Sequence, residues 1–170
     1  MRDPPSFRQV PSMTALHPKA PYWIRQGIFD DLRSFDVFEN RVNKIIEEKD
    51  RGDAFEIFIE GYLATQTITQ CVRHWVVGDI PLSLRERYKL PRDPTGIDGI
   101  YEVHDGSKVA YQVKYRQNHR LTFSEVAEFL GITEQFSDRV IFTNAAKLSD
   151  KAGGLNRSTQ HFILEGKDVV

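Results

Sequence analysis

Residues 97–115 read IDGIYEVHDGSKVAYQVKY, and this stretch decides the fold class. Two runs of mostly branched and aromatic residues, 97–103 and 108–115, flank the tetrapeptide 104–107, which contains an Asp-Gly pair. An Asp-Gly pair between two such runs is typical of a tight turn between antiparallel strands. We therefore predict a β-hairpin here.

Polar side chains interrupt both strands of this hairpin. Gln112 and Lys114 are two residues apart, so they should share one face of their strand. Asp98 begins the neighbouring strand and can face the same spot across the hairpin. Buried polar groups need partners, and carboxylate and amide oxygens suit a hard cation such as Mg²⁺. The three residues indicate either a metal-dependent phosphodiester site or, more plainly, a half-exposed strand face with a Lys–Asp ion pair.

Helical periodicity dominates the region before the hairpin. Residues 34–49 predict a helix capped by Ser34 or Asp36, and Asp50-Arg51-Gly52 should break it. Asp53 should cap a second helix that runs to residue 64. The expected core stripes of the two helices are Phe35, Phe38, Val42, Ile45, Ile46, Phe55, Phe58, Ile59, Tyr62 and Leu63.

Strands and helices alternate through the rest of the chain. Thr122 and Glu125 stand in capping-box register, so they should open a helix whose core face includes Phe123, Val126, Ala127, Phe129 and Leu130. The remaining expected elements are strands at 72–77, 139–143 and 160–164, a long loop at 78–96 and a polar helical stretch at 147–155. This order predicts an α/β architecture with a central mixed sheet flanked by helices.

The N-terminal region differs from the rest of the chain. Five prolines fall within residues 1–21, which favours an irregular arm because proline lacks an N–H donor and restricts the residue before it. We expect an arm over residues 1–33 and one domain over residues 34–170.

Composition restricts the classes of function. The 170 residues suit a single domain, and a formal net charge of −1 means that any basic surface for nucleic acid must be local. A single cysteine, Cys71, excludes internal disulfides and a cysteine-based zinc site. No run approaches the roughly 20 apolar residues of a membrane span, so we expect a cytoplasmic protein without membrane contact.

Three motifs in this order resemble the PD-(D/E)XK nuclease superfamily. They are Lys49-Asp-Arg-Gly-Asp-Ala-Phe-Glu56, Pro94-Thr-Gly-Ile-Asp98 and Tyr111-Gln-Val-Lys-Tyr115. The pattern is most similar to the Mrr-like branch, where glutamine replaces the acidic residue of the second motif. It also resembles the nuclease module at the N-terminus of type ISP and related helicase-containing restriction enzymes. The resemblance covers roughly residues 34–165 and implies a restriction-endonuclease-like core.

The resemblance implies specific roles. Asp98 is the expected principal metal ligand, Gln112 adds its side-chain oxygen, and Val113 adds its backbone carbonyl. Glu56 from the first core helix reaches the metal directly or through water, with Glu60 as the weaker substitute, and Lys114 positions the attacking water. The expected cofactor is Mg²⁺, with Mn²⁺ as a substitute. Because glutamine is neutral, the expected metal affinity is weaker than that of an all-acidic site.

The resemblance also implies partners and a setting. The expected activity is Mg²⁺-dependent endodeoxyribonuclease activity in a restriction or anti-phage system, with a helicase or translocase as partner and the chain as a piece of a longer protein. Arg116, His119 and Arg120 follow Lys114 closely, so we expect them to contact DNA. A homodimer would provide two sites for cutting both strands.

Two other functions stay open from the sequence. The first is a nuclease-fold module that binds DNA or a protein partner without cutting, which the neutral Gln112 favours. The second is a protein-interaction domain whose proline-rich arm docks a partner.

Overall fold

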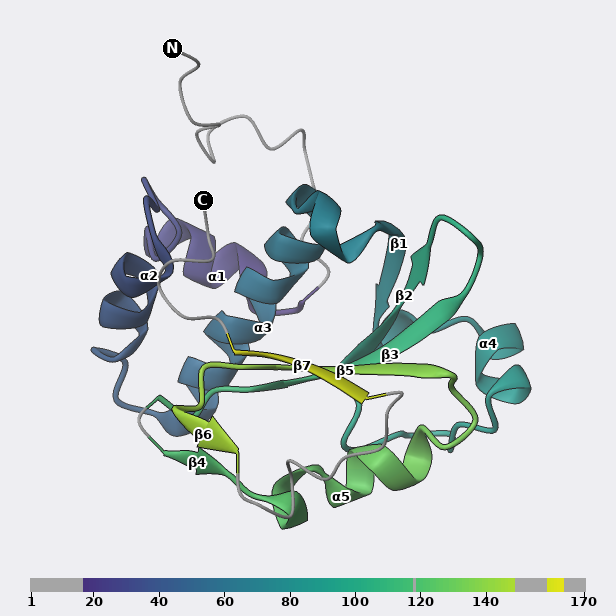
Figure 1. The fold of residues 1–170 in the computed structure, drawn as a ribbon. Coiled ribbons are helices and arrows are strands. Elements are labelled where there is room, and N and C mark those ends of the chain that lie inside the picture. Colours follow the sequence, from purple (N-terminus) through teal and green to yellow (C-terminus); the bar gives the residue numbers. More distant parts are fainter. Residues whose placement is uncertain (1–16, 118, 149–158, 164–170) are drawn as a thin grey trace.

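A five-stranded mixed sheet forms the centre of the computed structural model, which describes residues 17–117, 119–148 and 159–163. Its strand order is β1-β2-β3-β5-β7 (Figure 1). The first three strands are antiparallel neighbours, whereas β3, β5 and β7 run parallel. Their bounds are β1 Cys71–Val76, β2 Gly99–Val103, β3 Lys108–Lys114, β5 Asp138–Thr143 and β7 Thr159–Ile163. A separate two-stranded sheet pairs β4 (Arg120–Leu121) with β6 (Lys147–Leu148). The predicted α/β class with a central mixed sheet is confirmed.

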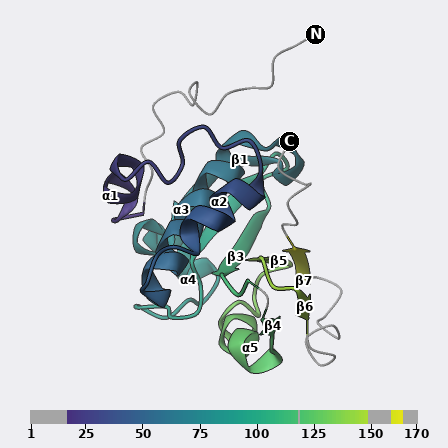
Figure 2. The same cartoon turned by 90° about the vertical axis from the view of Figure 1, so that its left-hand side faces the viewer.

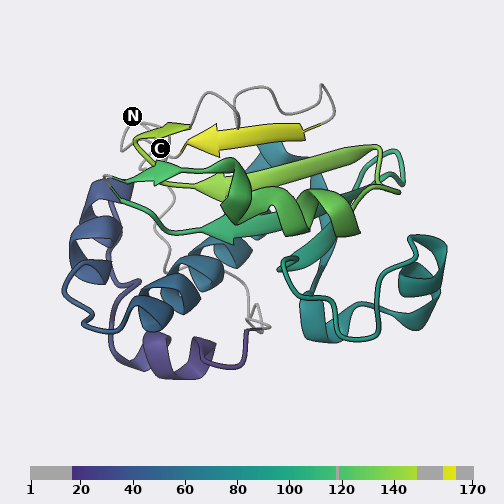
Figure 3. The same ribbon diagram turned by 90° about the horizontal axis from the view of Figure 1, so that it is seen from below.

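Helices cover both faces of this sheet (Figures 1 and 2). On one face lie α1 (Ala20–Arg25), α2 (Phe35–Val42) and α3 (Glu48–Thr65), and their apolar residues form one core with Tyr111 and Val113. On the other face lies α5 (Phe123–Ile132) (Figure 3). Its apolar residues share a second core with Ala110 of β3 and with the segment between β1 and β2. Alternate residues of β3 thus serve opposite layers, as a period of two requires.

The predicted hairpin is confirmed. Gly99 pairs with Tyr111 and Glu102 with Lys108, so β2 and β3 are antiparallel across the turn at residues 104–107. Gly106 has a φ of 86°, a conformation that glycine adopts without steric cost.

The predicted break between the first two helices is wrong in position. Ser34 does cap α2, since its Oγ accepts from Val37 N at 3.4 Å, but α2 ends at Val42. Helix α3 begins at Glu48, so the expected breaker Asp50-Arg51-Gly52 and the expected cap Asp53 lie inside it. Ion pairs of Lys19 with both aspartates offset the low helix propensity of these residues. Ile46, expected in the core stripe, is 89% exposed in the connection between the helices.

The expected domain boundary after residue 33 does not follow the packing. Ala20, Trp23 and Ile28 are buried in the same core as α2 and α3. The segment from residue 17 onward is therefore part of the domain, and residues 1–16 of the expected arm lie outside the described residues.

Helix α5 follows its sequence signals at its start. Its capping box is present, because Glu125 Oε2 accepts from Thr122 N at 2.8 Å. Val126 and Phe129 are fully buried as expected, but Phe123 is 44% exposed at the first position of the helix. The expected polar helix at 147–155 is instead strand β6 at 147–148, and its remainder lies outside the described residues.

The long segment at 78–96 contains a short helix, α4 (Leu82–Arg87), instead of loop alone. Its Arg85 side chain donates to three carbonyl groups, those of Val77, Ile80 and Arg92. This basic residue therefore organises the segment. No helix in the described part of the chain has the length and apolar character needed to cross a membrane.

Candidate metal and phosphodiester site

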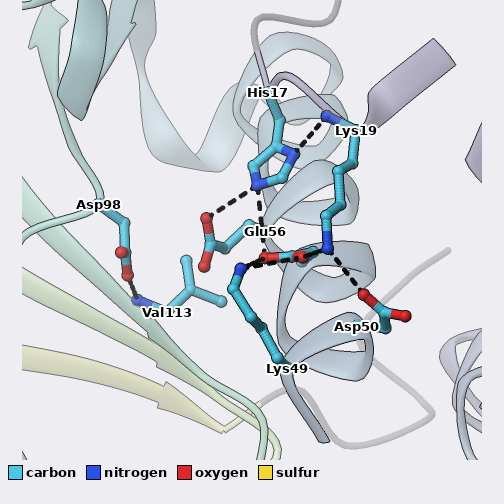
Figure 4. Close-up of polar contacts among 8 residues, drawn as sticks. His17, Lys19, Lys49, Asp50, Glu56, Asp98 and Val113 are labelled. Atoms are coloured by element: carbon cyan, nitrogen blue, oxygen red, sulfur yellow. Dashed lines mark hydrogen bonds and ion pairs between the residues drawn. The ribbon is translucent and has the colours of Figure 1, made fainter. Parts of the chain in front are cut away.

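Asp98 directly precedes β2 and is fixed to β3 by its backbone and its side chain. Its N–H donates to the carbonyl of Tyr111 at 3.0 Å, and its Oδ2 accepts from Val113 N at 2.6 Å (Figure 4). The carbonyl of Asp98 also accepts from Val77 N at 2.9 Å, which ties it to the end of β1. Among the described residues no hydrogen bond engages Oδ1, so this carboxylate oxygen can take a ligand.

The Asp98 carboxylate lies in an environment that disfavours its charge. Burial and the nearby Glu56 carboxylate raise the pKa of Asp98 to about 7, although the Val113 N–H, Lys114 and His17 act in the opposite direction. Figure 4 shows the Glu56 side chain, from α3, between Asp98 and His17. Two close carboxylates, of which Asp98 has a raised pKa, are a natural place for a divalent cation, which would neutralise both.

Gln112 contributes a buried amide oxygen. Its side chain is on the α5 face of β3, and the residue is only 3% exposed. Its Nε2 donates to the carbonyl of Gly96 at 2.8 Å, within the Thr-Gly-Ile-Asp run. Its Oε1 is buried without a hydrogen-bond partner in the described part of the chain. An unsatisfied buried oxygen is costly, so this acceptor fits a role as a cation or water ligand.

Lys114 ends β3 on the same face as Gln112, as predicted. Its charge helps to lower the pKa of Asp98, so the ammonium group lies within electrostatic reach of that carboxylate. Within residues 17–117, 119–148 and 159–163 it makes no ion pair at 4.0 Å or less. The half-buried Lys114 side chain is thus near Asp98 and Glu56 without forming an ion pair with either of them among the described residues.

Some of the predicted site residues lie near Asp98, and others have different contacts. Asp98, Glu56 and Lys114 are coupled through their charges, and Val113 contacts Asp98 through its amide N–H. The direct contact of the Gln112 side chain is Gly96. Glu60, the weaker candidate, is 2% exposed within α3.

Sequence reasoning missed an additional group of residues beside Glu56. His17 Nε2 lies 3.4 Å from Glu56 Oε2 and 3.7 Å from Asp53 Oδ1. The hydrogen bond with Glu56 raises the pKa of His17. Asp50, Asp53 and Glu56 recur every three residues, so they share one helix face, which favours basic neighbours. This spacing in the sequence indicates a basic partner for the helix face. It does not identify His17 as that partner, because His17 lies in the proline-rich segment that was expected to be an irregular arm.

Asp53 is engaged by two lysines. Its Oδ2 lies 2.5 Å from Lys19 Nζ, and its Oδ1 lies 3.2 Å from Lys49 Nζ. Burial opposes ionisation of Asp53, but these hydrogen bonds outweigh it, and the pKa of Asp53 is lowered. Asp53 is therefore an ionised partner of the lysines.

The residues expected to contact DNA differ in accessibility. The Arg116 guanidinium donates through Nε to Glu125 Oε1 at 2.5 Å and through Nη1 to the carbonyl of Tyr115 at 2.8 Å. These bonds give Arg116 a structural role in the loop after β3. His119 and Arg120 are exposed.

A single asparagine shapes this loop. Asn144 Oδ1 accepts from Arg116 N at 2.7 Å and from Gln117 N at 3.0 Å, and its Nδ2 donates to Glu39 Oε1 at 2.6 Å. The chain that leaves Lys114 is thereby attached both to the end of β5 and to α2.

Comparison of the chain with protein-family models, with curated proteins and with solved structures gave no match. The resemblance to the PD-(D/E)XK superfamily therefore rests on the three sequence motifs alone.

Proposed function

We propose that this chain is a metal-dependent DNA endonuclease domain with a restriction-endonuclease-like core. The observation that carries the proposal is the buried Asp98 carboxylate near Glu56 and Lys114: burial and, after it, the Glu56 charge raise the pKa of Asp98 to about 7, and the Lys114 ammonium acts in the opposite direction. An acidic pair with a neighbouring lysine at a strand end provides the charges that hydrolysis of a phosphodiester needs.

Each residue has a distinct task in this proposal. Asp98 Oδ1 and Glu56 would hold Mg²⁺ or Mn²⁺, whereas the Gln112 side chain lies on the α5 face of β3, donates to Gly96 and would act from that side through a water. When bound, the cation supplies an activated water and stabilises negative charge on the phosphate. Val113 N–H orients the Asp98 carboxylate by its hydrogen bond to Oδ2. Lys114 would orient the attacking water and stabilise developing charge.

The proposed substrate is DNA, which His119 and Arg120 would contact through its backbone. The motif resemblance supports a restriction or anti-phage setting in the cytoplasm, with a helicase or translocase as partner and pairing of two copies for double-strand breaks.

A plasmid-nicking assay with Mg²⁺ or Mn²⁺ tests the activity. Supercoiled plasmid should be nicked by the wild type, and Lys114→Met should slow nicking roughly 100-fold or more through loss of charge stabilisation. Lys108→Met is the matched control, because Lys108 occupies the same face at the other end of β3 and pairs with Glu102 at 3.0 Å. Nicking by wild type that equals nicking by Asp98→Asn would refute the enzyme assignment.

A non-cutting, DNA-binding module is the second candidate. The neutral Gln112, whose amide is hydrogen-bonded to Gly96, favours it because the site then has fewer negative charges to hold a cation. DNA binding without nicking in either metal would select this function.

A further inference from the structure

His17 reaches the candidate site from a segment that precedes α1. Its Nε2 contacts Asp53 and Glu56 on one face of α3, and Figure 4 shows the imidazole beside Glu56. Lys19 ties this segment down through ion pairs with Asp50 at 2.7 Å and Asp53 at 2.5 Å. The following residue, Ala20, is fully buried. The ion pairs of Lys19 and the burial of Ala20 therefore hold this segment beside α3. They place the imidazole at Glu56 even without the contact between the two side chains.

The two ring nitrogens of His17 have different partners. Nδ1 accepts a hydrogen bond from the backbone N–H of Lys19 at 3.1 Å. A nitrogen that accepts has no proton, so in the neutral ring the proton resides on Nε2. Nε2 then donates toward Glu56 Oε2 at 3.4 Å. Rotating the ring by 180° would lose both contacts, which fixes this orientation.

This tautomer argues against His17 as a metal ligand. The ligand atoms of His17, Asp53 and Glu56 lie within 4.8 Å of one another, a spacing that a cation could bridge. A metal-bound histidine, however, normally donates a hydrogen bond through its second nitrogen, whereas here that nitrogen accepts one. Asp53 is moreover neutralised by Lys19 and Lys49.

We propose that His17 is a positioning residue that holds Glu56 Oε2 and thereby presents Oε1 to a divalent cation shared with Asp98. This role rests on the proposed function. The imidazole N–H fixes the rotamer of a long carboxylate that would otherwise be repelled by Asp98. Residues before α1 thus complete a site whose other members come from α3 and from the β2–β3 hairpin.

The test uses two substitutions at His17 and a matched control. His17→Gln keeps an N–H donor near the position of Nε2, whereas His17→Leu removes the donor. His104→Leu makes the same chemical change at an exposed histidine in the hairpin turn. Mn²⁺ affinity is measured by isothermal titration calorimetry, and nicking is measured in parallel. Thermal melts of the metal-free proteins establish that each variant is folded.

We expect His17→Leu to weaken Mn²⁺ binding about 10-fold, in the range for loss of a partner that orients a metal ligand. His17→Gln and His104→Leu should stay within about 3-fold of the wild type on the same scale. Equal losses in His17→Gln and His17→Leu would identify the imidazole as a direct ligand and overturn the proposal. Wild-type affinity in His17→Leu, in a protein that binds Mn²⁺ and nicks DNA, would overturn the positioning role alone.

A spectroscopic measurement separates this inference from the proposed function. Long-range ¹H–¹⁵N NMR correlations of the metal-free protein should show His17 with its proton on Nε2 and not on Nδ1, and Glu56→Gln should shift the Nε2 resonance. A proton on Nδ1 in the neutral ring would overturn the inference whatever the enzyme does. Wild-type protein that neither binds Mn²⁺ nor nicks DNA would overturn the proposed function, and the positioning role with it.

Discussion

Replacing Asp98 by asparagine should stabilise the metal-free protein at neutral and alkaline pH. Asparagine is isosteric, and its Oδ1 can accept the hydrogen bond of Val113 N–H, which Asp98 Oδ2 accepts at 2.6 Å. It removes a carboxylate whose charge is opposed by burial and by Glu56. The substitution therefore tests the electrostatics of the site without requiring catalysis.

The structure gives both the sign and the size of this effect. The pKa of Asp98 rises from 3.8 to about 7 on folding, a difference of roughly 3 pH units. At about 1.4 kcal/mol per unit this is at most about 4 kcal/mol, and residual solvent access reduces it to roughly 2–4 kcal/mol. A raised pKa gives stability that is fully present below pH 3.8 and is lost as pH rises through 7. The Asp98→Asn variant does not undergo this loss, because its amide does not ionise.

Urea unfolding in EDTA between pH 4.5 and 8.5 measures the difference. The free energy of unfolding of Asp98→Asn minus that of the wild type should be small at the acidic end and grow to a plateau above pH 7. Asp105→Asn is the control, because the hydrogen bonds from Ser107 lower the pKa of Asp105 and reverse the sign. An Asp98→Asn protein that is less stable than the wild type at pH 8, or a difference that is independent of pH, would refute the reasoning.

Two other predictions concern packing and reactivity. Gly99→Ala should destabilise the protein by about 3 kcal/mol in urea unfolding, because the new Cβ would lie 2.4 Å from the backbone oxygen of Trp75 and 2.5 Å from the Tyr111 hydroxyl. Gly61→Ala in α3, where a Cβ meets nothing within 4 Å, should instead stabilise by up to ~1 kcal/mol, and equal effects of the two changes would contradict this account. Burial raises the pKa of the Cys71 thiol to about 11, so at pH 8 Cys71 should react with a disulfide reagent about 100-fold more slowly than in urea-unfolded protein. A native rate close to the unfolded rate would show the thiol to be freely ionising.

Local signals predicted most of the architecture. The Asp-Gly turn, the capping box of Thr122 and Glu125, and the apolar run at 139–143 each specify structure through neighbours in sequence, and the corresponding elements are present. The α2–α3 break was misplaced because Asp50 is kept in the helix by Lys19, a residue 31 positions away. Tertiary ion pairs of this kind override propensity and leave no local trace.

The candidate site was predictable to the same extent. The period of two predicted that Gln112 and Lys114 share one strand face, and the contacts of Asp98 with β3 are instead with Tyr111 O and Val113 N. The position of His17 was not predictable, because it depends on how the segment before α1 crosses α3. Nor did the sequence show that the Arg116 guanidinium is held by Glu125, since that pairing depends on the fold of the loop.

The burial of Trp23 and Ile28 against α2 and α3 has a practical consequence for anyone who transplants this unit into another protein. A fusion joint at residue 33 would remove Trp23, Ile28 and His17. The remaining fragment would expose the apolar surface of α2 and α3 that Trp23 and Ile28 cover. A joint at or before residue 16 keeps every residue whose packing against α2 and α3 is described above. A fusion that begins after residue 17 would therefore show the loss of stability caused by truncation and not the properties of the intact domain.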